Sequence, residues 1–308
     1  MLQAHLKAQR IAPAYLFIGP DGVGKRLAAL EFSKALNCEH TKDEACDHCA
    51  ACGRISRGVH PDVHQVSPQG ALALIRVDDI RSLLGRVGLR PYMGRWQVAI
   101  IDGADRLNEE SGNLLLKTLE EPPRQTRFVL LTSQPDDCLP TIVSRCERVR
   151  FQRLEPSLIE RLLVSQQAEP AVAAAVSRMA QGSLARAAQL AAQWPSYQQM
   201  MAQLGRPEPS AWLEWPVPTE RDAVARWLAG SIAWLRDVSM AAAGDDSLLQ
   251  HAGTAAIRQQ AQRLDPEACA ASAVRMIHLS ESLEQLVSPR MVGTLLREEW
   301  IQLLNLEL

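Results

Sequence analysis

From about residue 14 to residue 152 the chain alternates short apolar runs with amphipathic segments. The runs are brief and end in polar or glycine-rich residues, a pattern typical of parallel strands connected by helices. The predicted strands are 15–18, 97–101, 128–131 and 147–151. The first half of the chain is therefore predicted to be an α/β domain built on a parallel sheet.

Apolar residues at helical spacing predict the helices between these strands. One helix follows the first strand over residues 27–36, and Asp78 is expected to cap a second helix. The second helix carries an apolar stripe formed by Ile80, Leu83, Leu84 and Val87. A third helix begins near Asn108 and stops at Pro122 and Pro123, because proline cannot continue a helix. Its buried residues are expected to be Leu115 and Leu119.

The strand pattern ends near Leu154, and helical segments follow. Pro156 and Pro170 each open a short helix, which predicts a small helical domain over 154–200. Prolines between residues 205 and 219 predict a linker, and the amphipathic helices after it predict a third, all-helical domain over 201–308. Six of the seven tryptophans lie at position 194 or later, where they indicate either core packing, which we favour, or an oligomer contact.

Composition narrows the class of protein. With 308 residues and 47% hydrophobic content the chain can bury a full core, and a net charge of −2 argues against nucleic-acid binding by bulk electrostatics. No apolar stretch approaches the roughly 18 residues of a membrane span, and the first ten residues lack the apolar core of a signal peptide. We therefore expect a cytoplasmic protein, whose seven cysteines are not disulfide-bonded.

A glycine-rich loop with the sequence GPDGVGKR occupies residues 19–26, between the first strand and the first helix. This placement lets backbone N–H groups and a helix N-terminus face a phosphate. The candidate nucleotide-binding residues are Gly19, Gly22, Gly24 and Lys25. Arg26 stands where a hydrolase carries the Ser or Thr that binds magnesium, and a guanidinium repels that metal. The loop either binds nucleotide or stays empty, and the sequence leaves both alternatives open.

Asp102 directly follows the strand 97–101 and is a further candidate nucleotide-site residue, because P-loop enzymes place a magnesium-binding carboxylate there. The next position, where a glutamate often activates water, is Gly103, which has no side chain to accept a proton. In a second interpretation, which is compatible with the first, Asp102 and Asp105 cap the following helix. Arg26 and Gly103 together predict a chain that lacks a catalytic centre of its own.

Four cysteines are closely spaced after the first helix: Cys38, Cys46, Cys49 and Cys52. Their spacing lets them converge on one tetrahedral ion, and a closed shell of four thiolates predicts structural zinc rather than a catalytic metal. An iron cluster or free thiols are alternatives, as is one ligand from His40, His48 or His60. The remaining cysteines are isolated and are expected to be small buried side chains: Cys138, Cys146 and Cys269.

Arg145 lies in the tripeptide Ser144-Arg145-Cys146, just before the strand 147–151. An arginine at the rim of a nucleotide-binding sheet can reach a neighbouring subunit and neutralise charge on a transferred phosphoryl group. Arg145 is therefore a candidate arginine finger that acts in trans. The alternative is a solvated surface that it shares with Arg148, Arg150 and Arg153.

These segments together resemble the clamp-loader branch of the AAA+ proteins. The likeness rests on GPDGVGKR at 19–26, the four-cysteine insert, VAIIDGADRL at 98–107, NLLLKTLEEPP at 113–123 and TIVSRC at 141–146. The resemblance implies a RecA-like AAA+ domain over 1–153 with a zinc module at 38–52, a helical lid over 154–200, and a helical collar for oligomerisation over 201–308. Motor subunits of this branch place an arginine directly after Gly-Ser-Leu, whereas here Ala185 takes that position and Arg186 is one residue late, which predicts that Arg186 misses the phosphates.

The resemblance also implies partners and a division of labour within the DNA polymerase III holoenzyme. Five subunits, including motor subunits (gamma/tau) and a delta subunit, form a ring that opens the sliding clamp and places it on primed DNA. This chain is expected to be a ring member that does not hydrolyse ATP but supplies Arg145 to a neighbour. Two hypotheses compete: an ATP-hydrolysing motor subunit of the same branch, and a zinc-dependent nucleic-acid-binding module, which the absence of aromatic residues between Cys38 and Cys52 weakens.

Overall fold

The structure is a computed structural model that describes residues 2–69, 74–244, 249, 255–285 and 287–305. Contacts divide the chain into two compact units. The first comprises Met1–Ile159 with Gln181–Arg186, and the second comprises Glu160–Ala180 with Ala187–Leu308. The three-domain boundaries expected at 153/154 and 200/201 stay a prediction.

The first unit is built on a sheet of five parallel strands in the order β2-β3-β4-β1-β5. The strands are β1 (Ala14–Ile18), β2 (Val63–Val66), β3 (Gln97–Asp102), β4 (Thr126–Thr132) and β5 (Glu147–Arg150). The four strands expected from the sequence are confirmed, and so is the α/β class. The sequence pattern missed β2, because this edge strand is only partly buried and carries His64 and Gln65 between its two valines.

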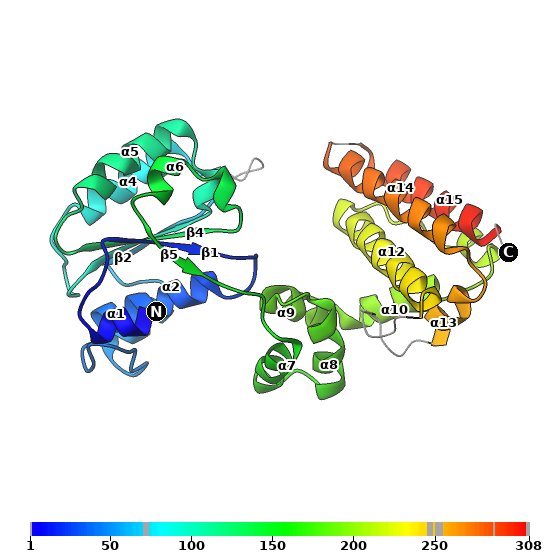
Figure 1. Cartoon of the computed structure of the whole chain (residues 1–308), viewed down its shortest axis with the longest axis horizontal. Coiled ribbons are helices and arrows are strands. Elements are labelled where there is room, and N and C mark those ends of the chain that lie inside the picture. The colour runs from blue at the N-terminus through cyan, green and yellow to red at the C-terminus, as the bar shows by residue number, and fades with distance from the viewer. Residues whose placement is uncertain (1, 70–73, 245–248, 250–254, 286, 306–308) are drawn as a thin grey trace. The chain divides into compact units, whose positions relative to one another are not determined.

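Helices cover both faces of the sheet (Figure 1). On one face lie α1 (Leu2–Lys7) and α2 (Lys25–Asn37), which pack on a layer that includes Tyr15, Phe17 and Val129. On the other face lie α4 (Val77–Val87), α5 (Glu109–Glu120) and α6 (Pro140–Val143). The remaining short elements of this unit are α3 (Ala50–Ser56) and two 3-10 helices, η1 (Ala104–Arg106) and η2 (Pro135–Asp137). Since successive strand residues face opposite layers, the fully buried strands need the near-continuous apolar runs seen in the sequence.

The helix caps differ in part from those expected. Asp78 does not cap α4: the N-cap is Arg76, whose backbone N–H donates to Asp79 Oδ2 at 3.2 Å, while Asp78 forms an ion pair with Arg81. For α5 the expected start is confirmed, because Asn108 Oδ1 accepts the backbone N–H of Ser111 at 2.9 Å. The expected burial of Leu115 and Leu119 is also confirmed.

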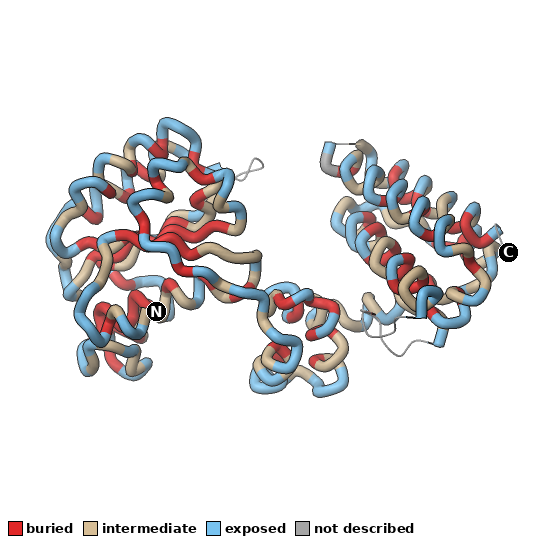
Figure 2. Tube along the Cα trace, viewed as in Figure 1, coloured by how far each residue is buried: buried red, intermediate tan, exposed pale blue. Residues whose placement is uncertain are grey.

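The second unit is helical. Its helices, with α7 and α9 shared with the first unit, are α7 (Pro156–Ser165), α8 (Pro170–Met179), α9 (Leu184–Ala192), α10 (Trp194–Leu204), α11 (Ser210–Leu213), α12 (Arg221–Ala242), α13 (Ala255–Ala261), α14 (Pro266–Glu284) and α15 (Pro289–Asn305). Figure 2 shows buried residues along the facing sides of its long helices. Among the described residues, no helix is both long and apolar enough to cross a membrane.

Tryptophans form much of the core of the second unit, which confirms the core interpretation for the four that are buried there: Trp212, Trp215, Trp234 and Trp300. Trp212 stacks on Trp300 with ring centroids 4.9 Å apart and planes at 6°, and both side chains are fully buried. The expectation of a linker over 205–219 is therefore wrong in part. Within that segment α11 forms a short helix, because burying Trp212 outweighs the irregular structure that the surrounding prolines favour.

Candidate functional site

The glycine-rich loop connects β1 to α2, and the side chain of its lysine contacts the backbone of the loop. Lys25 Nζ donates to the carbonyl oxygens of Gly19 at 2.5 Å and Pro20 at 2.8 Å, and it lies 3.5 Å from Asp21 Oδ1. Only 8% of Lys25 is exposed. Gly24 caps α2 with φ 98°, a left-handed conformation that an L side chain rarely adopts. The loop therefore has the strand-to-helix placement of a phosphate cradle, with its ammonium group held by loop carbonyls.

The segment 181–186, part of the same unit, packs against this loop. The backbone N–H of Ala185 donates to the Gly22 carbonyl at 3.3 Å. A Cβ atom on Gly22 would lie 2.1 Å from Ser183 Oγ and 2.9 Å from Ala185 Cβ, so this close approach requires glycine. Ala185, at the position where the resemblance expects an arginine in a motor subunit, thus contacts the loop with a methyl group. Arg186 is exposed, and that it misses bound phosphates stays a prediction.

Arg26 lies where the magnesium ligand of a hydrolase would be, and its charge acts on Asp102. Burial raises the pKa of the Asp102 carboxyl above its ordinary value, and the positive charges of Arg26 and Lys25 oppose that rise. Arg26 Nη2 also donates to Gln65 Oε1 in β2 at 3.1 Å. The structure therefore brings Lys25, Arg26 and Asp102 together at the carboxyl edge of the sheet, with a fixed guanidinium near the carboxylate.

The backbone at position 103 leaves no room for the side chain of a catalytic base. Gly103 has φ 90°, and a Cβ atom there would lie 2.9 Å from Pro68 Cγ. The capping interpretation of Asp102 and Asp105 is wrong, because α5 is capped by Asn108. Asp105 Oδ1 instead accepts the hydroxyl of Thr132 at 2.6 Å, which joins η1 to the end of β4.

The four cysteines converge as expected, between the end of α2 and the start of α3. The Sγ atoms of Cys38, Cys46, Cys49 and Cys52 all lie within 4.8 Å of one another. Backbone N–H groups approach two of them, from Cys49 to Cys46 Sγ at 3.3 Å and from Cys52 to Cys49 Sγ at 3.4 Å. This donor set fits a structural tetrahedral ion such as Zn²⁺, which four thiolates would enclose without an open position for substrate. The identity of the ion stays a prediction.

The electrostatics of this cluster favour a thiolate at its first position. Burial alone would raise the pKa of the Cys38 thiol, but hydrogen bonds from Thr41 and from the backbone of His40 and Cys46 lower it to about 5. None of the three alternative histidines belongs to the cluster within the described residues. The isolated cysteines are buried as expected, and burial raises the pKa of Cys146 to about 12 and of Cys269 to about 11.

Arg145 lies apart from the loop residues, just after α6. Its guanidinium forms an ion pair with Glu120 of α5, at 2.5 Å between Nη2 and Oε1, and donates to the Thr141 carbonyl at 3.0 Å. Arg148 and Arg150 are exposed on the edge strand, where they line a cavity of about 770 Å³ together with Gly19 and Cys138. Arg153 differs from them, because it donates to the Gln181 carbonyl at 3.0 Å and links the residues that follow β5 to the segment 181–186.

Sequence reasoning missed one polar cluster. Asp62, which directly precedes β2, is fully buried and accepts three backbone N–H groups of the loop between α4 and β3. The only sequence signal was an aspartate beside an undetected strand, which is too weak to predict such an anchor.

Comparisons with known proteins identify the family. A protein-family profile described as "DNA polymerase III, delta subunit" matches residues 1–155, half of the chain. The chain belongs to this family. The expected resemblance to the clamp-loader branch is confirmed, at the level of a DNA polymerase III clamp-loader family member.

The curated relatives include two kinds of subunit. The chain is 37% identical over 180 residues to DNA polymerase III subunit delta' of Bacillus subtilis, a match that covers 58% of this chain and 54% of that one. It is 40% identical over 136 residues to subunit delta' of Pseudomonas aeruginosa, covering 44% and 42%. Subunit tau of Bacillus subtilis is 42% identical over 159 residues, covering 51% and 28%. The chain thus spans about half the length of the delta' relatives, and less of tau.

A solved structure supports the fold of the chain. A gamma subunit-related protein of Thermotoga maritima aligns with a TM-score of 0.51 and 15% sequence identity, over 98% of this chain and 99% of that one. At this identity the likeness concerns the fold alone.

Proposed function

We propose that this chain acts as the delta' subunit of a DNA polymerase III clamp loader, a ring member that does not hydrolyse ATP itself. The proposal rests on one contrast. The nucleotide site of this chain lacks groups that hydrolysis needs, whereas Arg145, at a different place in the same unit, is retained. Arg26 replaces the magnesium ligand beside Asp102, and Gly103 has no room for the side chain of a base. Ala185 contacts the phosphate loop where a motor subunit would place an arginine.

Arg145 is the group proposed to serve a neighbour. A guanidinium is charged at every physiological pH and presents a rigid fork of donors, which suits the equatorial oxygens of a phosphoryl group in transfer. The Thr141 carbonyl and Glu120 orient the side chain at the end of α6. In the proposed ring, Arg145 meets ATP that is bound by an adjacent motor subunit and stabilises the charge that develops during cleavage.

The proposed assembly follows from the resemblance and from the relatives. Its members are the gamma/tau motor subunits and a delta subunit, and the ring loads the sliding clamp onto primed DNA. The zinc module at residues 38–52, the lid at 154–200 and the collar at 201–308 are proposed parts of this chain's role in that ring. The four-cysteine geometry supports the first of them.

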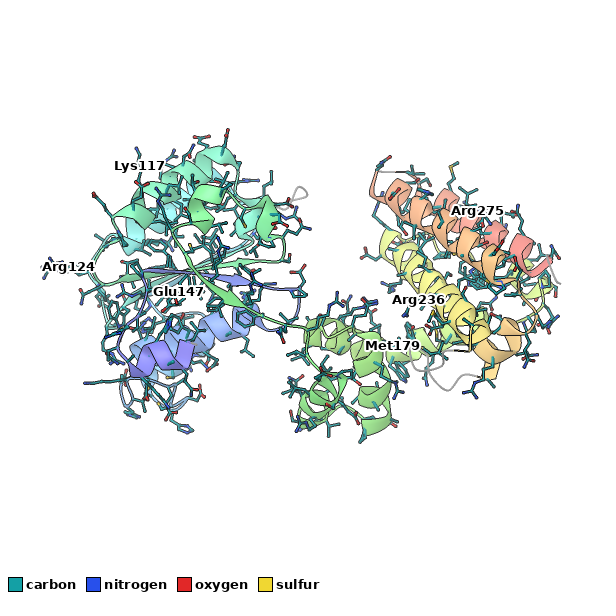
Figure 3. The ribbon with its side chains drawn as sticks, in the orientation of Figure 1. Lys117, Arg124, Glu147, Met179, Arg236 and Arg275 are labelled. Atoms are coloured by element: carbon teal, nitrogen blue, oxygen red, sulfur yellow. The ribbon has the colours of Figure 1, made fainter. Side chains whose placement is uncertain are left out.

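The decisive measurement is the DNA-stimulated ATPase of a reconstituted loader that contains Arg145→Ala. Loss of an arginine finger typically costs about 10³-fold or more in the rate of the site it serves, so we expect the ATPase to fall strongly while the ring still assembles. Arg124→Ala is the matched control, because Arg124 is also exposed and projects from the first unit (Figure 3). An unchanged ATPase with Arg145→Ala would exclude the role in trans.

A motor subunit of the same branch is the competing function, favoured by the 42% identity to a tau subunit and by the retained Lys25. The two functions differ in what the isolated chain does. Our proposal expects ATP hydrolysis at background, equal in wild type and in Lys25→Ala. Steady turnover that Lys25→Ala abolishes would establish the motor function instead.

A further inference from the structure

The loop between α4 and β3, residues 88–96, has a fixed backbone. The Asp62 carboxylate, fully buried, accepts the backbone N–H groups of Tyr92 at 2.6 Å, Met93 at 2.8 Å and Gly94 at 2.7 Å. Hydrogen bonds to a carboxylate are about twice as strong as those between neutral groups. Three of them on successive residues define the path of the loop at its tip.

A second anchor ties the loop to the cysteine module. Asn37 Oδ1 accepts the N–H groups of Arg95 and Trp96, both at 2.9 Å. The Arg95 guanidinium donates to the carbonyl of Cys38 at 2.9 Å and to that of Thr41 at 3.0 Å. The base of the loop is therefore held by the end of α2 and by the first residues of the four-cysteine module.

Three large apolar side chains on this fixed backbone are exposed. Tyr92 is 84% exposed, Leu89 68% and Met93 51%, and Val59, which follows α3, is 64% exposed. Arg54 on α3 joins the two segments, because its Nη1 lies 3.5 Å from Met93 Sδ. We call the exposed side chains of residues 54–59 and 86–95 the tyrosine surface. Exposed apolar residues that gather on an ordered surface mark an interaction site, whereas single ones are normal.

The tyrosine surface carries positively charged side chains and no negatively charged ones. Residues 54–59 and 86–95 contain five arginines and no aspartate or glutamate, although the chain as a whole has a net charge of −2. Tyrosine, methionine and arginine are the residue types enriched in the buried centres of protein interfaces. Single-stranded nucleic acid would use the arginines and the Tyr92 ring, but it gives no role to the aliphatic Leu89 and Val59. The composition therefore favours a protein partner.

We infer that the tyrosine surface docks onto an acidic protein partner, whose apolar pocket receives Tyr92 and Leu89 and whose carboxylates meet Arg54 and Arg90. The inference rests on the proposed function in one respect, because it places that partner among the components of the replication machinery. The anchoring by Asp62 and Asn37 orders the loop before the partner binds, so binding loses little conformational entropy.

The test places the photo-crosslinker p-benzoylphenylalanine at position 92 of the full chain. The probe is a mixture of purified proteins: the other loader subunits, the sliding clamp and primed DNA. We expect an adduct with a protein, at a site flanked by aspartate or glutamate, and an about tenfold loss of that adduct in Arg54→Glu/Arg90→Glu. The same crosslinker at Leu27, which is also exposed, and the charge reversal Arg161→Glu in the second unit are the controls.

A binding measurement completes the test. The anchors hold backbone N–H groups, so Tyr92→Ala removes the ring and keeps the loop path, which hydrogen exchange of the amides of residues 92–94 can check. Binding to the protein found in the adduct should weaken about tenfold with Tyr92→Ala and remain unchanged with Arg161→Glu. Three results would overturn the inference: an adduct with DNA, an adduct whose yield is the same in Arg54→Glu/Arg90→Glu, or no adduct above the Leu27 control. Each of these leaves the Arg145→Ala result untouched, so the proposed function fails or stands separately.

Discussion

At the scale of single residues, the phosphate loop has the placement of a phosphate cradle, and we propose that it lacks the groups needed for hydrolysis. Lys25 and the loop glycines preserve the strand-to-helix turn, whereas Arg26 brings a permanent positive charge close to Asp102. The sequence predicted from these residues that the site does not hydrolyse ATP, because motif residues have fixed chemical requirements, and that stays a prediction. It did not predict that Ser183 and Ala185 would pack on Gly22, since that contact joins residues about 160 positions apart.

Replacing Arg26 with threonine should restore a metal ligand without restoring hydrolysis. The hydroxyl can hold magnesium beside Asp102, but Gly103 and Ala185 still lack the base and the cation of a motor site. We expect calorimetry to show ATP binding that depends on magnesium in Arg26→Thr and not in wild type. Arg26→Ala, which removes the charge without adding a ligand, is the control. Magnesium-dependent ATP binding by the wild-type chain would contradict this account of Arg26.

Gly22→Ala should destabilise the first unit by about 1–3 kcal/mol, because the residue has φ 74° and its Cβ atom would clash with Ser183 Oγ. Gly24→Ala carries the backbone strain alone, since its Cβ atom would meet nothing within 4 Å, and should cost less. Urea unfolding followed by circular dichroism provides the comparison. Equal losses from the two variants would show that the segment 181–186 does not press on the loop.

At the scale of elements, the sequence pattern predicted the buried central strands and missed an edge strand and a short helix. The fully buried strands β1, β3 and β4 carry continuous apolar runs, and their positions were predicted closely. The edge strand β2 is short and only partly buried, and its two polar residues are adjacent rather than alternating with apolar ones, so no periodicity identified it. The short helix α11 was hidden for a related reason: its stability comes from long-range stacking between Trp212 and Trp300, which no local pattern encodes.

The segment around β2 should make the first unit sensitive to acid. Burial lowers the pKa of His60 and of His64, so their imidazoles are neutral in the fold, while unfolded histidine takes a proton near pH 6.5. The free energy of unfolding should therefore fall as the pH drops below about 6.5. Comparison of urea unfolding at pH 7.5 and 5.5 should show a smaller loss in His60→Gln/His64→Gln than in wild type.

Protonation of Asp62 should cause a second decrease in the free energy of unfolding, at lower pH. Burial would raise the pKa of its carboxyl, but the N–H groups of Gly94, Tyr92 and Met93 outweigh burial and lower the pKa. Its stabilising effect is therefore complete above about pH 4, near the pKa of an unfolded aspartate, and is lost as the pH falls further. Asp62→Asn should remove this acid-dependent step, at the cost of lower stability at neutral pH. A wild-type chain whose unfolding free energy is constant between pH 5 and pH 3 would contradict this role.

At the scale of the whole molecule, the tryptophans and the four-cysteine module are distributed unequally between the two units. All six tryptophans from Trp194 onward lie in the second unit, and Trp96 alone lies in the first. The four-cysteine module lies in the first unit, far along the chain from the tryptophan-rich core. Ion binding by the cysteines concerns the first unit, whereas the fluorescence of six of the seven tryptophans reports on the second.

We propose that the four cysteines hold a structural ion, so treatment with a metal chelator should loosen the first unit and leave the second unchanged. We expect hydrogen exchange to accelerate in α2, α3 and the 88–96 loop, because Arg95 ties that loop to Cys38, while exchange in the long helices of the second unit is unchanged. Elemental analysis should find about one metal ion per chain, absent from Cys49→Ser and retained in Cys269→Ala. Unaltered exchange in α3 after complete metal removal would argue against a structural ion.

The chain leaves the first unit after Ile159 and returns to it for Gln181–Arg186 alone. No single continuous stretch of sequence therefore reproduces this unit, and a fragment that stops after β5 would lack the backbone donor that Ala185 gives to Gly22. Nucleotide affinities measured on such a truncated protein would describe an uncovered cradle that the intact polypeptide does not possess.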